Sequence, residues 1–371
     1  MRRWIMMCEL FLPLAISALF LFCGKPMVVW MARIDTGTDE KPVAIMASDE
    51  QLVVVGNQGR KDGVSVWLVQ WLDRKGKLLR RVTVAGGRFN VLGDGCLDRE
   101  GNIYLAGYTS HYDTTVAMVV KISPAGRVLW KKGLALGKET RANGVCMVDT
   151  LVAITGGVVT GDGEQIFVAI LDRNGKTVWS KSYPQREPGA GFKIKSDPNG
   201  TLVVLGRSGV VPDLLLVKID SQGDTVWTRG YDSRGRDEPG NLVLDQFGNV
   251  VAVGTAQVGD STRCVILEYT ADGGVVRKVA YGENAQAVGW GVCVSEKGNI
   301  FICGALLGAQ QSKGLVFEYV PNAISIWERQ IAMDKGMVAR GVVYNQGLFV
   351  VAEVIDKSSD IAVLELFYTE R

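Results

Sequence analysis

The chain has 371 residues, of which 47% are hydrophobic and 22% charged, and this composition excludes a disordered protein and supports a large core. Its 41 lysines and arginines nearly balance its 39 aspartates and glutamates, so we expect no nucleic-acid partner. The single histidine, His111, argues against a histidine-built metal site and against a Ser-His-Asp triad. The 45 glycines are more frequent than the roughly 7% of an average protein and predict many turns.

The first 23 residues differ in character from the rest. Arg2 and Arg3 precede an apolar stretch at residues 10–23, which is shorter than the roughly 20 residues of a membrane span and suits the apolar segment of a signal peptide. The stretch ends at Cys23 and resembles a bacterial lipoprotein signal, which implies lipidation at Cys23. We therefore expect a signal segment at residues 1–23, a short tether at 24–26 and an exported body at 27–371. The alternatives are an uncleaved N-terminal anchor and cleavage near residues 15–17. All three place the body outside the cytoplasm. We expect an exported protein that is membrane-anchored in the bacterial envelope, at the periplasmic or the outer surface.

The body is an internal repeat. A hairpin pattern, in which an apolar run, a turn and a β-rich run end at a small residue, returns every 48 to 51 residues. The closing residues are Gly56, Gly107, Gly156, Gly206, Gly254, Gly304 and Ala352. A second hairpin follows in each unit, and no segment shows a long helical stripe. Four short strands per unit predict seven blades of an all-β propeller.

The second hairpin of most units ends in a tryptophan. These residues are Trp30, Trp130, Trp179, Trp227 and Trp327. Leu79 and Val276 are the apolar residues that we expect to replace the tryptophan in the two remaining units. A bulky side chain at this position predicts a blade-packing residue that covers the gap between neighbouring sheets.

The two ends of the chain predict a closed ring. The last unit has three strands, near residues 341–344, 348–352 and 361–367, and lacks the fourth. Residues 27–34 read as that missing strand, with Trp30 in the expected place. We therefore predict a single seven-bladed β-propeller of four antiparallel strands per blade. Its last blade would be closed by the N-terminal strand, which removes two exposed sheet edges.

Two turn motifs carry a family resemblance. An Asp-x-x-Gly-Asn turn occurs at residues 98–102 and 245–249, and a Gly-x-x-x-Trp turn at residues 126–130, 175–179 and 223–227. With these motifs the body resembles the SBBP-type β-propeller repeats of bacterial exported proteins. The resemblance covers residues 27–371 and implies a propeller that binds or scaffolds in the cell envelope, with no single activity.

The residues themselves predict little chemistry. Gly175-Lys176-Thr177 lacks the earlier glycine of a phosphate loop, and no Gly-x-Ser-x-Gly elbow occurs. The five cysteines of the body show no Cys-x-x-Cys spacing, so we expect buried thiols. We expect no catalytic residue, no cofactor and no metal ligand. An envelope enzyme of quinoprotein or polysaccharide-lyase type, with loop residues that escape recognition, is the alternative, and a purely structural spacer is a third hypothesis.

Binding would use the loop face of the ring. Connections from strand two to strand three and from one blade to the next emerge on this face, and we expect them to be its longer and more variable loops. Several inter-blade connections hold an arginine: Arg88, Arg141, Arg186, Arg236 and Arg340. If these arginines converge they would attract a carboxylate or a sulfated glycan. Otherwise they point to solvent or pair with neighbouring acids such as Glu139 and Glu238. We expect a monomer that binds an envelope protein or glycan and contacts the membrane through its N-terminal lipid or anchor.

Overall fold

The computed structural model describes residues 28–111, 114–282, 286–308, 311–319, 336–356 and 358–368, together with the backbone of residues 327–331. In these segments all regular secondary structure is β-strand. No helix in this part of the chain is long and apolar enough to cross a membrane. Residues 1–27 lie outside the described segments, so the signal segment, the tether and lipidation at Cys23 stay predictions.

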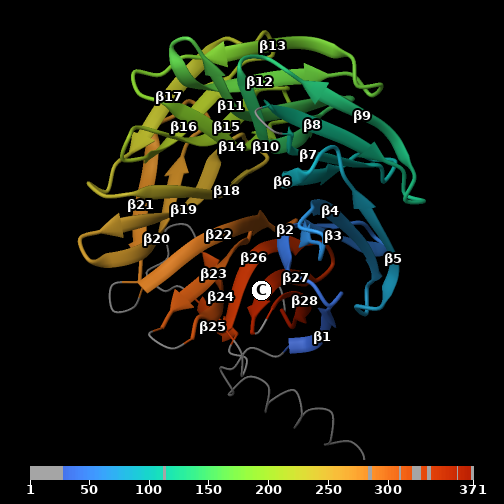
Figure 1. Cartoon of the computed structure of the whole chain (residues 1–371). Coiled ribbons are helices and arrows are strands. Elements are labelled where there is room, and N and C mark those ends of the chain that lie inside the picture. The colour runs from blue at the N-terminus through green and yellow to red at the C-terminus, as the bar shows by residue number, and fades with distance from the viewer. Residues whose placement is uncertain are drawn as a thin grey trace, which may run out of the picture.

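The strands form seven four-stranded antiparallel sheets that stand as blades around a central axis (Figure 1), as predicted. The innermost strands are β2 (Glu40–Ala47), β6 (Phe89–Leu97), β10 (Glu139–Val148), β14 (Gly189–Ser196), β18 (Asp237–Leu244), β22 (Gln286–Val294) and β26 (Gly336–Tyr344). The second strands are β3 (Gln51–Gly59), β7 (Ile103–His111), β11 (Leu151–Thr160), β15 (Leu202–Ser208), β19 (Val250–Val258), β23 (Ile300–Leu307) and β27 (Leu348–Ile355).

The two outer positions of each blade complete the ring. The third strands are β4 (Ser65–Asp73), β8 (Thr114–Ile122), β12 (Gly163–Leu171), β16 (Asp213–Ile219), β20 (Ser261–Tyr269), β24 (Lys313–Tyr319) and β28 (Ser359–Leu366). The outermost strands are β5 (Leu78–Val84), β9 (Val128–Leu134), β13 (Thr177–Tyr183), β17 (Thr225–Tyr231), β21 (Val275–Tyr281), β25 (Trp327–Ile331) and β1 (Val28–Ile34). Blade one is β2–β5, and the numbering continues around the ring to blade seven.

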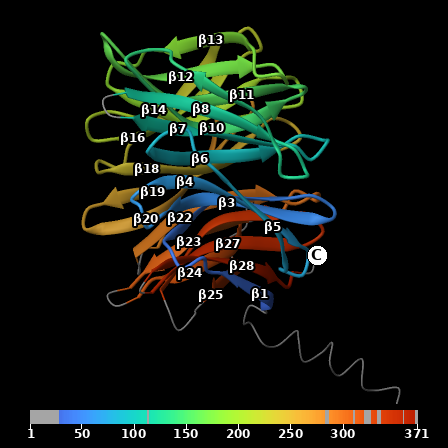
Figure 2. The same ribbon diagram turned by 45° about the vertical axis from the view of Figure 1, so that its right-hand side comes forward.

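Blade seven combines the first described strand with the last three, as the repeat pattern predicted. Its strand order is β1-β28-β27-β26, and β1 pairs antiparallel with β28 from Trp30 opposite Glu365 to Ile34 opposite Ile361. Figure 2 shows the blue β1 against the red β28. Main-chain hydrogen bonds between the first and the last described strand therefore close the ring and leave no gap between repeats.

The hydrophobic core lies between neighbouring blades. In one cluster, Trp67 and Val69 of blade one pack against Leu105 and Val120 of blade two. Another cluster packs residues of blade seven against residues of blade one, so the interface that closes the ring has the same character as the others. Each sheet is thus buried on both faces, and this explains why its middle strands are almost continuously apolar.

Tryptophans on the outermost strands lie against a turn of the next blade. Trp130 lies against Gly175, and its indole Nε1 donates to the carbonyl oxygen of Arg173 at 3.0 Å. Trp30, Trp179 and Trp227 meet the equivalent turn glycines Gly76, Gly223 and Gly273. These glycines have φ between 80° and 84°, a region that suits glycine. The side chain of Trp327 lies outside the described residues.

The apolar substitutes that we predicted for two units are wrong. Arg80, not Leu79, pairs with Trp71 at the position that Trp130 holds in blade two, because it stands four residues after the turn glycine Gly76, as Trp130 does after Gly126. Leu79 is 49% exposed, and Val276, displaced in the same way from Arg277, is 45% exposed. The aliphatic stem of Arg80 lies against Gly126, and its guanidinium donates to the carbonyl oxygen of Pro124 at 2.6 Å. A long arginine stem can bury apolar surface as an indole does, so a search for apolar residues missed it.

The expectation of long loops between strands two and three is also wrong. Strand β11 continues to Thr160 and β12 begins at Gly163, and in blade five only two residues separate β19 from β20. In these two blades the ladder of main-chain hydrogen bonds extends almost to the tip of the hairpin because two residues suffice for the turn, whereas five residues separate β3 from β4. The loop face is consequently built mainly from strand ends.

Candidate functional site

Every innermost strand contains one β-bulge at the same position. The seven bulged residues are Val43, Gly93, Asn143, Phe192, Gly240, Trp290 and Arg340. The repeating small residue of the second strand lies opposite the residue that precedes the bulge, as Gly56 lies opposite Pro42. A Cβ atom on Gly56 would stand 2.5 Å from the carbonyl oxygen of Lys41, so the close approach of the bulged strand requires glycine there.

The bulged residues surround a cavity on the axis of the ring. Its volume is about 390 Å³, and all seven bulged residues contribute to its wall together with Tyr108, Asp94 and Lys193. This volume falls in the range of about 300–1,000 Å³ that is usual for small-molecule sites. The bulges lie near the middle of each innermost strand, so the cavity is lined by residues from the middle of the ring.

Arg340 contributes a positively charged guanidinium group to the cavity wall. Its Nε and Nη2 donate to Oε2 of Glu353 at 3.0 and 2.7 Å, and its Cζ lies 4.7 Å from the ring centre of Trp290. The Glu353 residue is 4% exposed and the Arg340 side chain 30%. No residue in the described part of the chain accepts a hydrogen bond from Nη1 of Arg340. Its guanidinium is therefore held rigidly and has a donor group left for a ligand.

A second ion pair crosses the channel. Nζ of Lys193, in blade four, lies 3.0 Å from Oδ1 of Asp94, in blade two, and donates to the carbonyl oxygen of Gly93 at 3.1 Å. Asn143, in the blade between them, donates to the carbonyl oxygen of Gly191 at 2.9 Å. The Lys193 and Asp94 side chains are only 14% and 7% exposed. These contacts fix the polar wall of the cavity before any ligand arrives.

Aromatic rings complete the wall, and guanidinium groups lie against them. Arg207 lies 5.1 Å from the ring centre of Phe192, and Arg141 lies 6.0 Å from that of Tyr108. Nε1 of Trp290 is buried and has no acceptor among the described residues. A ligand with an apolar face and a negatively charged group could contact both the aromatic rings and the guanidinium groups.

The five arginines of the sequence-based site do not gather in this cavity. Arg340 lines it, whereas Arg141 does not and pairs with Glu139 and Glu164. Arg236 is exposed, and its Nε lies 2.7 Å from Oε1 of Glu238. Pairing with a neighbouring acid was the alternative stated in the sequence analysis.

The two remaining arginines are also exposed and do not contribute to the cavity wall. Arg88 lies 5.6 Å from the ring centre of Phe89, and Arg186 lies in the connection before β14. Their position between blades was predicted from the repeat, but the direction of each side chain was not.

The sequence analysis missed Trp290, Phe192, Asn143 and the Lys193–Asp94 pair. The signal that could have found the first three is their spacing, since each stands 13 or 14 residues before a repeating glycine. The bulge that turns them toward the axis depends on pairing with the second strand, which the spacing alone does not show.

A second cavity, of about 440 Å³, lies on the opposite face between the first hairpin turns of blades five and six. Phe247, Val276 and Glu296 contribute to its wall. Two blades build it, whereas the axial cavity collects side chains from all seven. The axial cavity is therefore the stronger candidate site.

The fold and the axial site define the chain as a seven-bladed β-propeller. No family model matches the sequence, so the resemblance to SBBP repeats stays a prediction. No curated protein matches it either. Solved structures do match the fold. A polysaccharide lyase of family PL25, an ulvan lyase, has a TM-score of 0.58 at 9% identity and covers 90% of this chain and 95% of its own.

Two further structures show the same architecture. The polysaccharide lyase Uly1 has a TM-score of 0.57 at 8% identity and covers 92% of this chain and 100% of its own. The propeller domain of the Trilobed protease from Pyrococcus furiosus has a TM-score of 0.54 at 10% identity, with coverage of 88% and 95%. At these identities the likeness concerns the fold alone.

Proposed function

We propose that this chain is a non-catalytic binding protein of the bacterial cell envelope, and that the axial cavity holds a carboxylate or sulfate of an acidic glycan. The observation that carries the proposal is the Arg340 guanidinium, fixed by Glu353 and Trp290 inside a cavity to which every blade contributes. Guanidinium groups bind planar carboxylates through two parallel hydrogen bonds, and the sugar ring would lie against the aromatic wall.

Preorganisation supports binding at this site. The lining residues stand on strands and not on loops, and Arg340, Lys193 and Asn143 are each held by hydrogen bonds to the protein. A site that is already ordered loses little entropy when a ligand enters, which favours affinity. A protein that presents an acidic side chain is the other partner we consider, and the experiment below distinguishes the two.

The envelope location in this proposal depends on residues 1–23. If Cys23 is lipidated, protein extracted from membranes has the mass of a chain that starts at Cys23 with acyl groups attached. Cys23→Ser should then release the protein from the membrane fraction. A full-length mass in the membrane fraction would favour the uncleaved anchor instead.

Calorimetric titration tests the ligand. Oligosaccharides that contain uronate or sulfate should bind, and neutral oligosaccharides of the same length should not. Arg340→Lys keeps the charge but loses the planar fork, and it should weaken binding about tenfold or more. Trp290→Leu removes the aromatic wall and should weaken binding as well.

Arg186→Gln is the matched control, because this exposed arginine lies outside the cavity. The control should bind as the unchanged protein does. Equal affinity of the Arg340→Lys and unchanged proteins for acidic glycans would contradict the proposal. Binding of an acidic peptide, but of no glycan, would favour a protein partner.

A second candidate function is cleavage of an acidic polysaccharide by elimination. The Tyr108 phenol lines the cavity, with the Arg141 guanidinium 6.0 Å from its ring, and such a pair could abstract a proton and neutralise the uronate carboxylate. Two structures with the same fold are named as polysaccharide lyases. A rise in ultraviolet absorbance from an unsaturated uronate product, lost in Tyr108→Phe, would favour the enzyme over the binding protein.

A further inference from the structure

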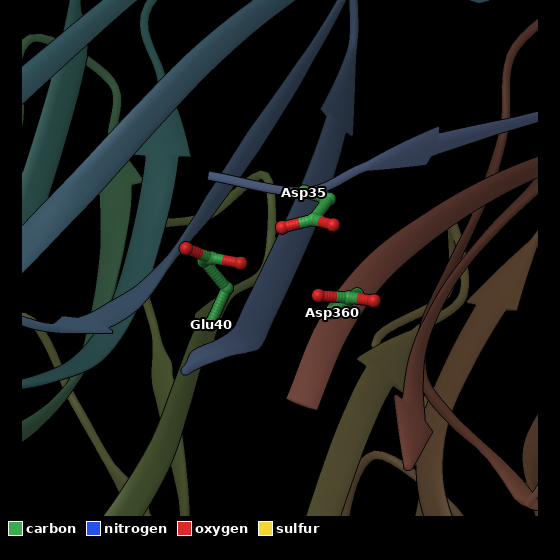
Figure 3. Close-up of side chains that lie close together, drawn as sticks. All are labelled: Asp35, Glu40 and Asp360. Atoms are coloured by element: carbon green, nitrogen blue, oxygen red, sulfur yellow. The ribbon is translucent and has the colours of Figure 1, made fainter. Parts of the chain in front are cut away.

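Three carboxylates meet where the ring closes. Asp35 follows β1, Glu40 is the first residue of β2 and Asp360 lies in β28, so they come from the N-terminal strand connection, blade one and blade seven. One oxygen of each lies within 4.8 Å of the others. Figure 3 shows the three groups facing one another between these elements. This cluster, the closure cluster, is separate from the axial cavity.

Two oxygens of the closure cluster are buried without a partner. Glu40 and Asp360 are both 0% exposed. Oε1 of Glu40 accepts from the Thr38 hydroxyl at 2.8 Å, and Oδ2 of Asp360 accepts from Arg33. Oε2 of Glu40 and Oδ1 of Asp360 have no hydrogen-bond partner among the described residues. A buried carboxylate oxygen without a partner is costly, and either a bound proton or a bound cation would relieve that cost.

The equivalent position of other blades shows the ordinary role of a polar side chain at the start of the innermost strand. Glu40 lies three residues before the bulge of its strand, as do Asn90, Thr140 and Asp237 in theirs. Each of those three side chains accepts from a backbone N–H four residues earlier, at 2.7 to 3.1 Å. Their role is to hold the connection that enters the blade.

Asp237 supplies an internal comparison. It belongs to a second acidic cluster, with Asp213 and Asp232, but Ser233 satisfies both its carboxylate oxygens through its backbone N–H and its hydroxyl. That cluster therefore lacks the unpaired buried oxygens of the closure cluster, and we assign it no ligand.

We propose that Asp35, Glu40 and Asp360 bind one calcium ion, which fastens β1, β2 and β28 together at the closure of the ring. All three donors are carboxylate oxygens, the ligands that calcium prefers. Calcium binds oxygens at about 2.3–2.6 Å, so ligands on opposite sides of one ion lie up to about 5 Å apart, which matches the cluster.

Charge agrees with a divalent ion. The three carboxylates carry three negative charges, and the Arg33 guanidinium on Asp360 supplies one positive charge. The remaining two charges equal those of one calcium ion. Water and nearby oxygens of the connection between β1 and β2 would complete the six to eight ligands that calcium takes. This proposal departs from the sequence-based expectation of no metal ligand, and it is independent of the glycan proposal.

The test uses the full chain, freed of metal with a chelator and dialysed, and calcium chloride alone as the probe. Titration calorimetry should show one calcium ion per chain. The Tm should rise by about 4 °C when calcium is about a hundredfold above its Kd, given the unfolding entropy of a chain of this size. Calcium modules outside the cell often have a Kd of about 0.1–1 mM, so the titration should reach tens of millimolar.

Two substitutions identify the site. Glu40→Gln keeps the side-chain length, and Asp35→Asn changes an exposed residue that the fold tolerates more easily. Both should abolish the heat of binding and the rise in Tm. Asp237→Asn, at the equivalent position of blade five, is the matched control and should bind calcium as the unchanged protein does.

Two results would overturn the proposal. One is an unchanged Tm and no heat with calcium in the unchanged protein. The other is a Glu40→Gln or Asp35→Asn protein that still binds calcium normally. A Glu40→Gln protein that is more stable than the unchanged protein, with no response to calcium in either, would mean that the carboxylates share a proton instead.

Discussion

Truncation of Trp227 tests how neighbouring blades are held together. The residue is 7% exposed, its ring centre lies 6.3 Å from that of Tyr269, and its Nε1 donates to the carbonyl oxygen of Ala271 at 3.2 Å. Trp227→Ala removes roughly 200 Å² of buried surface, which at about 25 cal/mol per Å² corresponds to about 5 kcal/mol. Measured losses for buried tryptophans are about 3–5 kcal/mol, so we expect about 4 kcal/mol.

Urea unfolding and calorimetry measure this loss. Unfolding entropy of about 2.1 cal/mol/K per residue, over about 340 residues, gives about 0.7 kcal/mol/K, so the Tm should fall by about 6 °C. Val226→Ala is the matched control, because Val226 is the adjacent residue on β17 and is 54% exposed. The control should change the free energy of unfolding by no more than about 0.5 kcal/mol.

The reasoning fails if Trp227→Ala unfolds at the same urea concentration and temperature as Val226→Ala. Such a result would mean that the indole contributes no stability to the interface between blades four and five. The covering role that we assign to the outermost strands would then have to be abandoned.

Three further predictions concern a glycine, a carboxyl group and the thiols. A methyl group on Gly156 would overlap a backbone carbonyl oxygen, so Gly156→Ala should cost about 3 kcal/mol or more in urea unfolding, whereas Gly161→Ala, with open space around it, should cost little. Burial raises the pKa of Asp237 above its ordinary value of 3.8, against the opposing hydrogen bonds from Ser233, so the folded state holds this proton more tightly than the unfolded state. The contribution of this group to stability is then greatest below about pH 3.8 and falls as the pH rises through the folded pKa. In urea unfolding between about pH 3 and 7, Asp237→Asn should flatten this fall in the free energy of unfolding. An unchanged slope would contradict the prediction. Burial raises the pKa of Cys146 and of Cys264 to about 12, so neither should react with a thiol reagent at about pH 8 until the protein is unfolded, and rapid labelling of the native protein would be the contrary result.

The number of blades could be predicted from the sequence because one steric requirement repeats. Gly56, Gly107 and their equivalents mark where a bulged innermost strand approaches the second strand too closely for a side chain. The closure could be predicted for a different reason. The last unit lacks a fourth strand, the segment around Trp30 supplies one, and a blade needs four strands to pair its backbone.

The candidate site was harder to predict, because its residues share a position in the ring but no chemical type. Valine, glycine, asparagine, phenylalanine, tryptophan and arginine all occupy the bulge. The search for arginines in the connections found Arg340 and also selected Arg88, Arg186 and Arg236, which lie outside the cavity. Leu79 shows a related limit, since neighbouring residues of a strand point to opposite faces and a prediction one position off selects an exposed side chain.

Local pattern therefore determined the strands, the seven repeats and the way the ring closes, since turns, alternation and close backbone contacts act over a few residues. Tertiary structure alone decided which side chains meet. Lys193 of blade four reaches Asp94 of blade two past the blade between them, and Asp35 and Glu40 reach Asp360 from the other end of the described chain. Such contacts depend on how many sheets pack around the axis and on how each strand is bulged. No short stretch of sequence contains that information, and both proposed sites depend on it.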